Sequence, residues 1–222
     1  MSKVLLIRHA QSANNAQPEH LRVCDPGITE LGQQQALQTA RTLTIHPIRG
    51  LYCSPFLRSL ETTRAIAEAK QLTPIIRADL FEQGGCYSGH LPGLKRGENG
   101  MGRSELSKRY PGWQIDSRIA EHGWWGNPYE SIEQAQQRAA KVVDWLESEV
   151  TTACDSLDVL VIHADFKQHM LAEMLGEPWN RLDSQVGPLY NAGMTLLDLA
   201  HGKWILHSFN CITHLPPNLL SM

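Results

Sequence analysis

The chain has 222 residues, of which 42% are hydrophobic, and its formal net charge at pH 7 is -3. This length and apolar content are sufficient for one sizeable core, so we expect a single domain over residues 1–222, with an insertion, rather than two domains. The slightly acidic balance gives no broad basic field, which argues against a nucleic-acid partner. Any affinity for an anion must therefore come from a local arginine cluster.

No apolar run approaches the roughly 20 residues of a membrane span. Residues 1–3 lead directly into the first apolar segment without a signal-peptide pattern, so we predict a cytoplasmic protein with no membrane partner. The five cysteines are odd in number and lack Cys-x-x-Cys spacing, which favours reduced thiols over a disulfide framework or a zinc ribbon. They are Cys24, Cys53, Cys86, Cys154 and Cys211.

The first predicted element is a strand over residues 3–8 that ends in a charged pair, Arg8 and His9. Consecutive apolar residues at 4–7 are typical of a strand that is buried on both faces. The carboxyl ends of such strands line the ligand crevice of open α/β sheets. A histidine beside a guanidinium, followed by small polar residues, is suited to a nucleophile that attacks a phosphoryl group. A plain surface strand end is the alternative.

Helices and short strands alternate after this strand. Thr29 can cap a helix that runs to about Leu43. Pro55 is expected in the opening turn of a second helix, where proline is well placed. The predicted elements are a helix over 29–43, a strand over 50–53, a helix over 56–69 and a strand over 74–76.

The periodic pattern breaks down between residue 84 and about residue 130. Seven glycines lie between residues 84 and 102, among arginines and tryptophans, so we predict an inserted cap or lid. Its tryptophans are expected to pack the lid, and a place in the substrate pocket stays open for one of them. Five basic residues of this segment have two possible roles. They could contact a second phosphate or a carboxylate of the substrate, or they could be solvated charges on the lid surface. They are Lys95, Arg96, Arg103, Arg109 and Arg118.

Regular patterns resume after the insertion. A capping box at Ser131 and Gln134 predicts the start of a long helix. Residues 157–163 repeat the N-terminal design, because an apolar strand ends in a histidine and a helix follows over 165–175. Two last strands, over 194–199 and 203–206, are expected to pair through the turn between them. The order predicts an α/β fold, a three-layer α/β/α sandwich with a mostly parallel central sheet and a cap insertion at about 84–130.

Three further residues are candidates for chemistry beside His9. If the strands that end in His9 and His163 are neighbours, their imidazoles meet at one crevice. Arg58 falls in the first turn of a helix, where the helix dipole also attracts anions. Glu82 begins the insertion, where a lid would exclude water and raise its pKa, so that it could act as a general acid. Two other carboxylates are open for the same role, Asp79 and Glu98.

These motifs resemble those of the histidine phosphatase superfamily, which has the phosphoglycerate-mutase-like fold. Its Arg-His-Gly-x-Thr/Ser-x-x-Asn signature is similar to residues 8–15, where alanine replaces the usual glycine. Its Pro-Leu-Thr-x-x-Gly-x-x-Gln-Ala segment is similar to residues 25–36, and its second arginine motif to residues 54–63. Its acid and second-histidine motifs resemble residues 80–82 and 161–163. The resemblance therefore follows the chain from residue 4 to about residue 197 in matching order.

The resemblance implies that His9 accepts the phosphoryl group as a neutral imidazole and that water then hydrolyses the phosphohistidine. Arg8, Arg58 and His163 would hold the phosphoryl oxygens. Glu82 would protonate the leaving oxygen and then activate the water. We assign substrate contacts to four further residues, Asn15, Ser12, Gln83 and Ala164.

Two of these assignments have open alternatives. Asn14 competes with Asn15, and Ser12 is equally suited to capping the following turn. The site needs no cofactor, and the spacing of His163, Asp165 and His169 lacks the density of a metal site. We therefore predict that the chemistry is independent of metal.

The residues after Glu82 favour a phosphatase over a mutase. Phosphoglycerate mutases carry a Glu-Arg-x-Tyr-Gly pattern, whereas residues 82–87 read Glu-Gln-Gly-Gly-Cys-Tyr. The prediction is a metal-independent phosphomonoester hydrolase that acts on a small phosphorylated substrate. The alternatives are phosphoglycerate-mutase-type phosphoryl transfer and a non-catalytic phospho-ligand-binding protein. The sequence does not choose among sugar phosphates, nucleotides and phosphoproteins, and a homodimer stays open.

Overall fold

The computed structural model describes residues 2–91, 93–150, 157–178, 181 and 187–222, and it contains a seven-stranded central sheet. The strands, in their order across the sheet, are β6 (Gln114–Ile115), β3 (Ile75–Ile76), β2 (Ile48–Cys53), β7 (Leu157–Ile162), β1 (Ser2–Arg8), β8 (Met194–Ala200) and β9 (Lys203–Cys211). Neighbours from β6 to β1 are parallel, whereas β8 is antiparallel to both β1 and β9. The predicted mostly parallel sheet is therefore confirmed.

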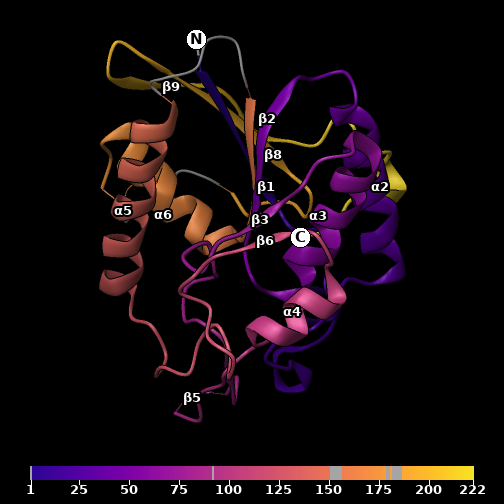
Figure 1. Cartoon of the computed structure of the whole chain (residues 1–222), viewed down its shortest axis with the longest axis vertical. Coiled ribbons are helices and arrows are strands. Elements are labelled where there is room, and N and C mark those ends of the chain that lie inside the picture. The colour runs from indigo at the N-terminus through magenta and orange to yellow at the C-terminus, as the bar shows by residue number, and fades with distance from the viewer. Residues whose placement is uncertain (1, 92, 151–156, 179–180, 182–186) are drawn as a thin grey trace.

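Helices cover both faces of this sheet. Figure 1 shows α2 (Glu30–Leu43) and α3 (Leu57–Lys70) on one side and α5 (Ile132–Val150) and α6 (Ala164–Leu175) on the other. Each helix pair packs on its own cluster of buried apolar side chains, and alternate residues of β1 and β7 point into the two clusters. The three-layer α/β/α sandwich is confirmed. The short elements are α1 (Ala13–Ala16), η1 (Glu19–Leu21), β4 (Tyr87–Ser88), β5 (Arg96–Gly97), α4 (Arg103–Arg109) and η2 (Pro217–Leu219).

Local capping signals placed most helix starts correctly, but the start of α3 differs from the prediction. Thr29 Oγ1 accepts the Gly32 N–H at 3.1 Å at the start of α2, as its sequence predicts. In α3 the N-cap is Phe56, so Pro55 lies before the helix and not in its first turn. Asp25 replaces a local cap, because its carboxylate accepts the Leu57 N–H at 2.8 Å from another part of the chain. Capping from a distant residue leaves no signal in the local sequence.

The β8–β9 hairpin turns through residues 200–202 as predicted, but β9 continues to Cys211, five residues beyond the predicted end at 206. Two irregularities in its register with β8 break the alternation on which the prediction depended. The described cysteines Cys24, Cys53, Cys86 and Cys211 are free thiols, as predicted, and Cys154 lies outside the described residues. Across the described part of the chain, each helix is too short or too polar to span a membrane.

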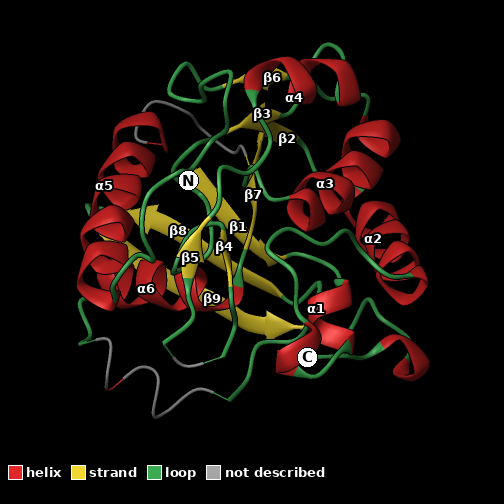
Figure 2. Cartoon of the chain, turned by 90° about the horizontal axis from the view of Figure 1, so that it is seen from below, coloured by secondary structure: helices red, strands yellow, loops and turns green. Residues whose placement is uncertain are grey.

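The insertion (residues 84–130) is more regular than its sequence indicated. It contributes the antiparallel pair β4–β5, the helix α4 and the edge strand β6 of the central sheet. Trp124 packs its ring against Phe56 and Phe81, with centroids 4.7 and 5.7 Å apart, so the insertion shares the core of the α2–α3 side. In Figure 2, β4 and β5 lie in front of the sheet, on the side to which β1 and β7 direct their carboxyl ends. Two-residue strands give no periodic pattern, which explains why the sequence did not indicate them. The role of the insertion as a cap stays a prediction.

Candidate active site

The strands that end in the two motif histidines are neighbours. β1 pairs in parallel with β7, and the His9 N–H donates to the Ile162 carbonyl at 2.9 Å. The rings of His9 and His163 consequently lie with their centroids 5.1 Å apart. The predicted meeting of the two imidazoles at the carboxyl edge of the sheet is confirmed.

His9 is held as a neutral ring with one nitrogen directed away from the pocket. Its Nδ1 lies 2.7 Å from the Ala10 carbonyl, and Arg58 Nε donates to its Nε2 at 3.2 Å. Burial lowers the pKa of His9 well below its usual value, and the charges of Arg58 and Arg8 lower it further. A neutral ring with its proton on Nδ1 satisfies both contacts, because Nδ1–H donates to the carbonyl and the Nε2 lone pair accepts the Arg58 N–H.

Two buried guanidinium groups flank this ring. Arg8 Nη1 donates to the Leu189 carbonyl, but Arg8 Nε is buried without a partner. Arg58 lies over the Phe56 ring, 4.0 Å from its centroid. Burial lowers the pKa of Arg8 to about 10, and Arg8 therefore stays cationic at neutral pH. The pocket thus presents positive charge and an unsatisfied donor, which a phosphoryl oxygen can satisfy.

His163 lies fully buried behind His9. Its Nε2 lies 2.7 Å from the Ser54 hydroxyl, and its Nδ1 is buried without a partner. Burial first, and then the nearby cationic Arg58, lowers the pKa of His163 well below its usual value. When Ser54 donates to Nε2, the ring proton occupies Nδ1, so Nδ1–H is a second donor in need of an acceptor.

Glu82 is a carboxylate of the same pocket as His9. It accepts hydrogen bonds from the Gln83 and Phe166 N–H groups, each at 2.9 Å. Burial, together with the negative charge of Asp165, raises the pKa of Glu82 to about 7. The two alternative carboxylates are engaged elsewhere: Asp79 pairs with Arg77 at 2.7 Å, and Glu98 accepts the Ser88 hydroxyl at 2.6 Å.

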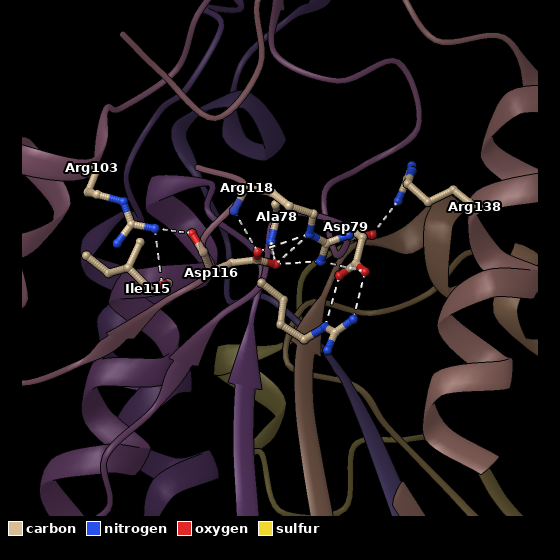
Figure 3. Close-up of polar contacts among 8 residues, drawn as sticks. Ala78, Asp79, Arg103, Ile115, Asp116, Arg118 and Arg138 are labelled. Carbon is tan, nitrogen blue, oxygen red and sulfur yellow. Dashed lines mark hydrogen bonds and ion pairs between the residues drawn. The ribbon is translucent and has the colours of Figure 1, made fainter. Parts of the chain in front are cut away.

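The loop that carries Glu82 is anchored by a network of arginines and carboxylates (Figure 3). Arg118 bridges Asp79 and Asp116, at 2.9 and 2.5 Å, and Asp116 also accepts the Ala78 N–H at 3.0 Å. On the other side, Arg138 of α5 donates to the carbonyls of Asp79 and Phe81, at 2.9 and 3.0 Å. The backbone just before Glu82 is therefore fixed from both the insertion and α5.

Arg138 also connects this loop to α6. Its guanidinium lies between the rings of Phe81 and Phe166, at 3.6 and 3.9 Å from their centroids, and forms a bidentate pair with Glu130. Since Phe166 supplies an N–H group to Glu82, Arg138 contacts both segments that orient the carboxylate. It is a positioning residue for Glu82 and lies outside the pocket wall.

We expect Arg138→Lys to lower kcat by about 10-fold with little change in KM, because lysine keeps the charge but cannot bridge both carbonyls and Glu130. Steady-state kinetics across pH would measure this, since a displaced Glu82 also shifts the basic limb of the pH profile. Arg64→Lys, on the exposed side of α3, is the matched control. An unchanged kcat in a folded Arg138→Lys protein would contradict a positioning role.

The predicted substrate contacts border one pocket of about 250 Å³, which His9, Arg8, Arg58 and Glu82 also line. His163 is not among the lining residues, because it is fully buried against the His9 ring, so its contact with a phosphoryl oxygen stays a prediction. Asn15 Oδ1 accepts hydrogen bonds from the N–H and hydroxyl of Ser12, so its amide nitrogen is the donor left for an anion. Asn14 is engaged instead, because its amide both donates to and accepts from the Val23 backbone. The four residues predicted to contact substrate, Ser12, Asn15, Gln83 and Ala164, all line this pocket.

Ser12 also precedes α1 as its N-cap, and the Gln83 side-chain oxygen lies 2.9 Å from His169 Nε2. Their substrate contacts, and that of Ala164, therefore stay predictions. Among the described residues, His, Cys, Asp and Glu side chains form no group of three or more that could hold a metal ion.

Sequence reasoning missed several side chains in the wall of this pocket. They are Arg22, Tyr87, His90, Tyr129 and Asp165. All but Asp165 lie on loops or in the insertion, where no periodicity relates them to the strand ends. Asp165 lies two residues after His163, so its place near a strand end was the one available signal.

The fold and this pocket define a class of α/β protein with a cationic, histidine-centred site at the carboxyl ends of parallel strands. The sequence profile of the Histidine phosphatase superfamily (branch 1) matches residues 4–212. The chain belongs to this superfamily, which confirms the predicted membership.

Individual relatives agree with this membership. The chain is 36% identical to phosphoserine phosphatase 1 of Hydrogenobacter thermophilus over 92 aligned residues. This aligned segment covers 41% of this chain and 44% of that protein. The metal-independent phosphoserine phosphatase of Arabidopsis thaliana is 24% identical over 97% of this chain and 84% of its own length. Mycobacterial glucosyl-3-phosphoglycerate phosphatase shares the fold, with a TM-score of 0.66 and 23% identity over 96% of this chain and 100% of its own. Together, the superfamily and these relatives support a phosphatase.

Proposed function

We propose that the protein is a phosphomonoester hydrolase that works through a phosphohistidine on His9. The observation that carries this proposal is the neutral His9 ring, whose Nε2 lone pair lies beside two buried guanidinium groups. A neutral imidazole is the form that can attack phosphorus, and the adjacent cations stabilise charge on the equatorial oxygens.

In the first step, Arg58 Nε transfers its hydrogen bond from His9 Nε2 to a phosphoryl oxygen. The freed Nε2 lone pair then forms a bond to phosphorus as the bond to the alcohol oxygen breaks. Arg8, Arg58 and His163 Nδ1–H bind the phosphoryl oxygens, and these contacts satisfy the unpartnered donors of Arg8 and His163. Glu82 transfers its proton to the departing alkoxide. A pKa near 7 suits this role, because a sizeable fraction of the carboxyl is protonated at neutral pH.

In the second step, water attacks the phosphohistidine. The Glu82 carboxylate takes a proton from this water, the phosphorus–nitrogen bond breaks, and inorganic phosphate and neutral His9 are regenerated. In both steps, side chains of this protein position the reacting groups and stabilise the charge that develops. We therefore propose that the reaction needs no metal ion. The pocket volume of about 250 Å³ favours a small phosphorylated substrate over a phosphoprotein.

Mutase-type transfer is the main alternative, and product analysis separates the two. With 3-phosphoglycerate in the presence of a chelator, we expect release of inorganic phosphate to exceed exchange between phosphoglycerate isomers by at least about 10-fold. The physical reason is that Gln83 occupies the position of the mutase arginine, so the glycerate is not held for rephosphorylation.

Phosphate release and isomer exchange can be followed in the same reaction by enzymatic phosphate detection and by ³¹P NMR. Dominant exchange would defeat the hydrolase proposal, and loss of activity with chelator would defeat metal independence. A protein that binds phosphate but neither hydrolyses nor transfers it would be the non-catalytic alternative.

A further inference from the structure

Three polar side chains form a connected group beside the loop that carries His9, and the proposed reaction does not use them. They are Gln35 of α2, Asn191 before β8 and Ser221 after η2, and we call them the amide network. Gln35 and Asn191 are fully buried. Gln35 Nε2 donates to the Ser221 hydroxyl at 2.9 Å, and that hydroxyl donates to Asn191 Oδ1 at 3.0 Å. Buried amides are costly unless they are hydrogen-bonded, so their place in the core needs a physical explanation.

Backbone groups fix which way each amide of the network points. Gln35 Oε1 accepts the Gln11 N–H at 2.8 Å, and Asn191 Nδ2 donates to the His9 carbonyl at 3.2 Å. A backbone N–H can only donate and a carbonyl can only accept, so neither amide can be reversed without losing its contact with the His9 loop. The segment 219–221 holds the other side, because the Asn191 N–H donates to the Ser221 carbonyl at 2.9 Å.

Asn191 in turn fixes the amide of Asn15. Asn191 Nδ2 donates to Asn15 Oδ1 at 3.3 Å, and the same oxygen accepts the Ser12 N–H at 3.0 Å. The Ser12 N–H and the Asn191 amide nitrogen can only donate, so a reversed Asn15 amide would set its own NH₂ group against two donors. The oxygen of Asn15 therefore faces Ser12 and Asn191, and its NH₂ group is left for the pocket that Asn15 lines.

The backbone beside Asn191 is held in an unfavourable conformation. Ala192 is fully buried and has a φ of 57°, in the left-handed region that residues with a side chain rarely adopt. In this conformation its N–H donates to the Arg8 carbonyl at 3.1 Å and lies 3.3 Å from the His9 carbonyl. Such conformations persist where the surrounding contacts impose them, and they concentrate at functional sites. The segment that carries Asn191 is therefore fitted closely to the two residues at the end of β1.

The orientation of Asn15 matters because the two ends of an amide have opposite effects on an anion. An NH₂ group donates to a phosphoryl oxygen, whereas an amide oxygen repels it. A donor that is already fixed in the correct orientation needs no reorganisation when the anion binds. Neither Asn191 nor Ser221 lines the pocket, so any effect of these two residues on an anion must pass through a residue that does.

We propose that Asn191 is a positioning residue that, held by Ser221, directs the NH₂ group of Asn15 toward the phosphoryl group. This inference rests on the proposed function, because it takes Asn15 as a ligand of a phosphoryl oxygen. Segment 219–221 then contributes to phosphate binding from outside the pocket wall.

The test is a double-mutant cycle on the binding of inorganic phosphate, measured by calorimetry. Asn15→Ala should raise the Kd by about 10-fold, the effect of one lost hydrogen bond to a charged group. Asn191→Ala should raise it by about 3- to 10-fold, because Asn15 keeps its side chain but loses its fixed orientation. If Asn191 acts through Asn15, the double variant should match Asn15→Ala within about 2-fold, whereas independent effects would multiply. A merely structural role for Asn191 would give the multiplied loss.

Ser221→Ala is the second variant, and it decides the question if Asn191→Ala does not fold. It removes only the hydroxyl that holds Asn191 Oδ1 and should raise the Kd for phosphate by about 2- to 3-fold, an effect that should vanish in the Asn15→Ala background. Asn218→Ala, at an exposed asparagine of η2, is the matched control and should bind phosphate as the wild type does.

The binding cycle separates this inference from the proposed function, because it needs no turnover. Non-additive losses in a protein that hydrolyses no phosphate ester would defeat the proposed function alone. Multiplied losses in an active phosphatase would overturn the positioning role alone. An unchanged Kd in folded Asn191→Ala and Ser221→Ala proteins, or in Asn15→Ala, would also overturn it.

Discussion

His9→Ala is expected to lower kcat by at least about 10⁴-fold, because removal of a nucleophile abolishes the covalent route and leaves only binding and charge stabilisation. Arg8, Arg58 and His163 remain in this variant, so phosphate binding should persist. Hydrolysis of p-nitrophenyl phosphate measures the loss directly. Wild-type protein quenched in alkali during turnover of a ³²P-labelled substrate should carry an alkali-stable, acid-labile label that His9→Ala lacks.

The matched control is His46→Ala, since His46 is an exposed histidine three residues beyond the last residue of α2. This variant should keep both the activity and the label. If His9→Ala hydrolysed substrate at the wild-type rate, or carried the same label, His9 would not be the nucleophile. A label that moved to His163 in the variant would assign the nucleophile to the neighbouring ring, 5.1 Å away.

The part of the site that the sequence predicted is the part that lies at strand ends. β1 and β7 have continuous apolar runs that end in His9 and His163, and the parallel pairing of such strands brings their carboxyl ends together. Arg58 follows from the same logic, because α3 begins after a connection of only three residues from the end of β2. The hydrophobic periodicity and the order of the strands and helices are enough to predict where these residues lie, since parallel strands bring their carboxyl ends to one edge of the sheet.

The residues that the sequence did not predict are held by contacts between distant segments. Arg138 lies on the regular helix α5, but its role comes from the carbonyls of Asp79 and Phe81. Arg22 and His90 line the pocket from loops that are far apart in the sequence, and the Asn14 side chain holds the Val23 backbone beside Arg22. No local pattern encodes such contacts, because their partners are far apart in the sequence and the segments carry no periodicity.

The buried polar atoms of the site show what the fold has left for a ligand to satisfy. Most buried donors and acceptors in proteins have partners, yet Arg8 Nε, His163 Nδ1 and His90 Nε2 do not. Arg8 and His90 line the pocket, whereas His163 is buried against the His9 ring and is not among the lining residues.

The pH dependence of the reaction is expected to follow Glu82. Its pKa is raised to about 7, first by burial and then by Asp165, and the first step requires the protonated carboxyl. The rate of alkyl phosphate hydrolysis should therefore fall as the pH rises through about 7. His9 should not limit the rate at lower pH, because its pKa is already well below the usual value and the ring stays neutral there.

Glu82→Gln removes the proton donor and should lower kcat for an alkyl phosphate by about 10²- to 10⁴-fold. The loss should be smaller for p-nitrophenyl phosphate, because p-nitrophenolate leaves without a proton, and the basic limb near pH 7 should disappear for the alkyl phosphate. Kinetics from pH 5 to 9 with the two substrates would measure the difference. Glu98→Gln is the matched control, since Glu98 accepts a hydrogen bond from Ser88 and lies outside the pocket wall. If Glu98→Gln removed the basic limb of the pH profile and Glu82→Gln kept it, the general acid would be Glu98. If Glu82→Gln lowered kcat equally for both substrates, Glu82 would act in binding and not in proton transfer.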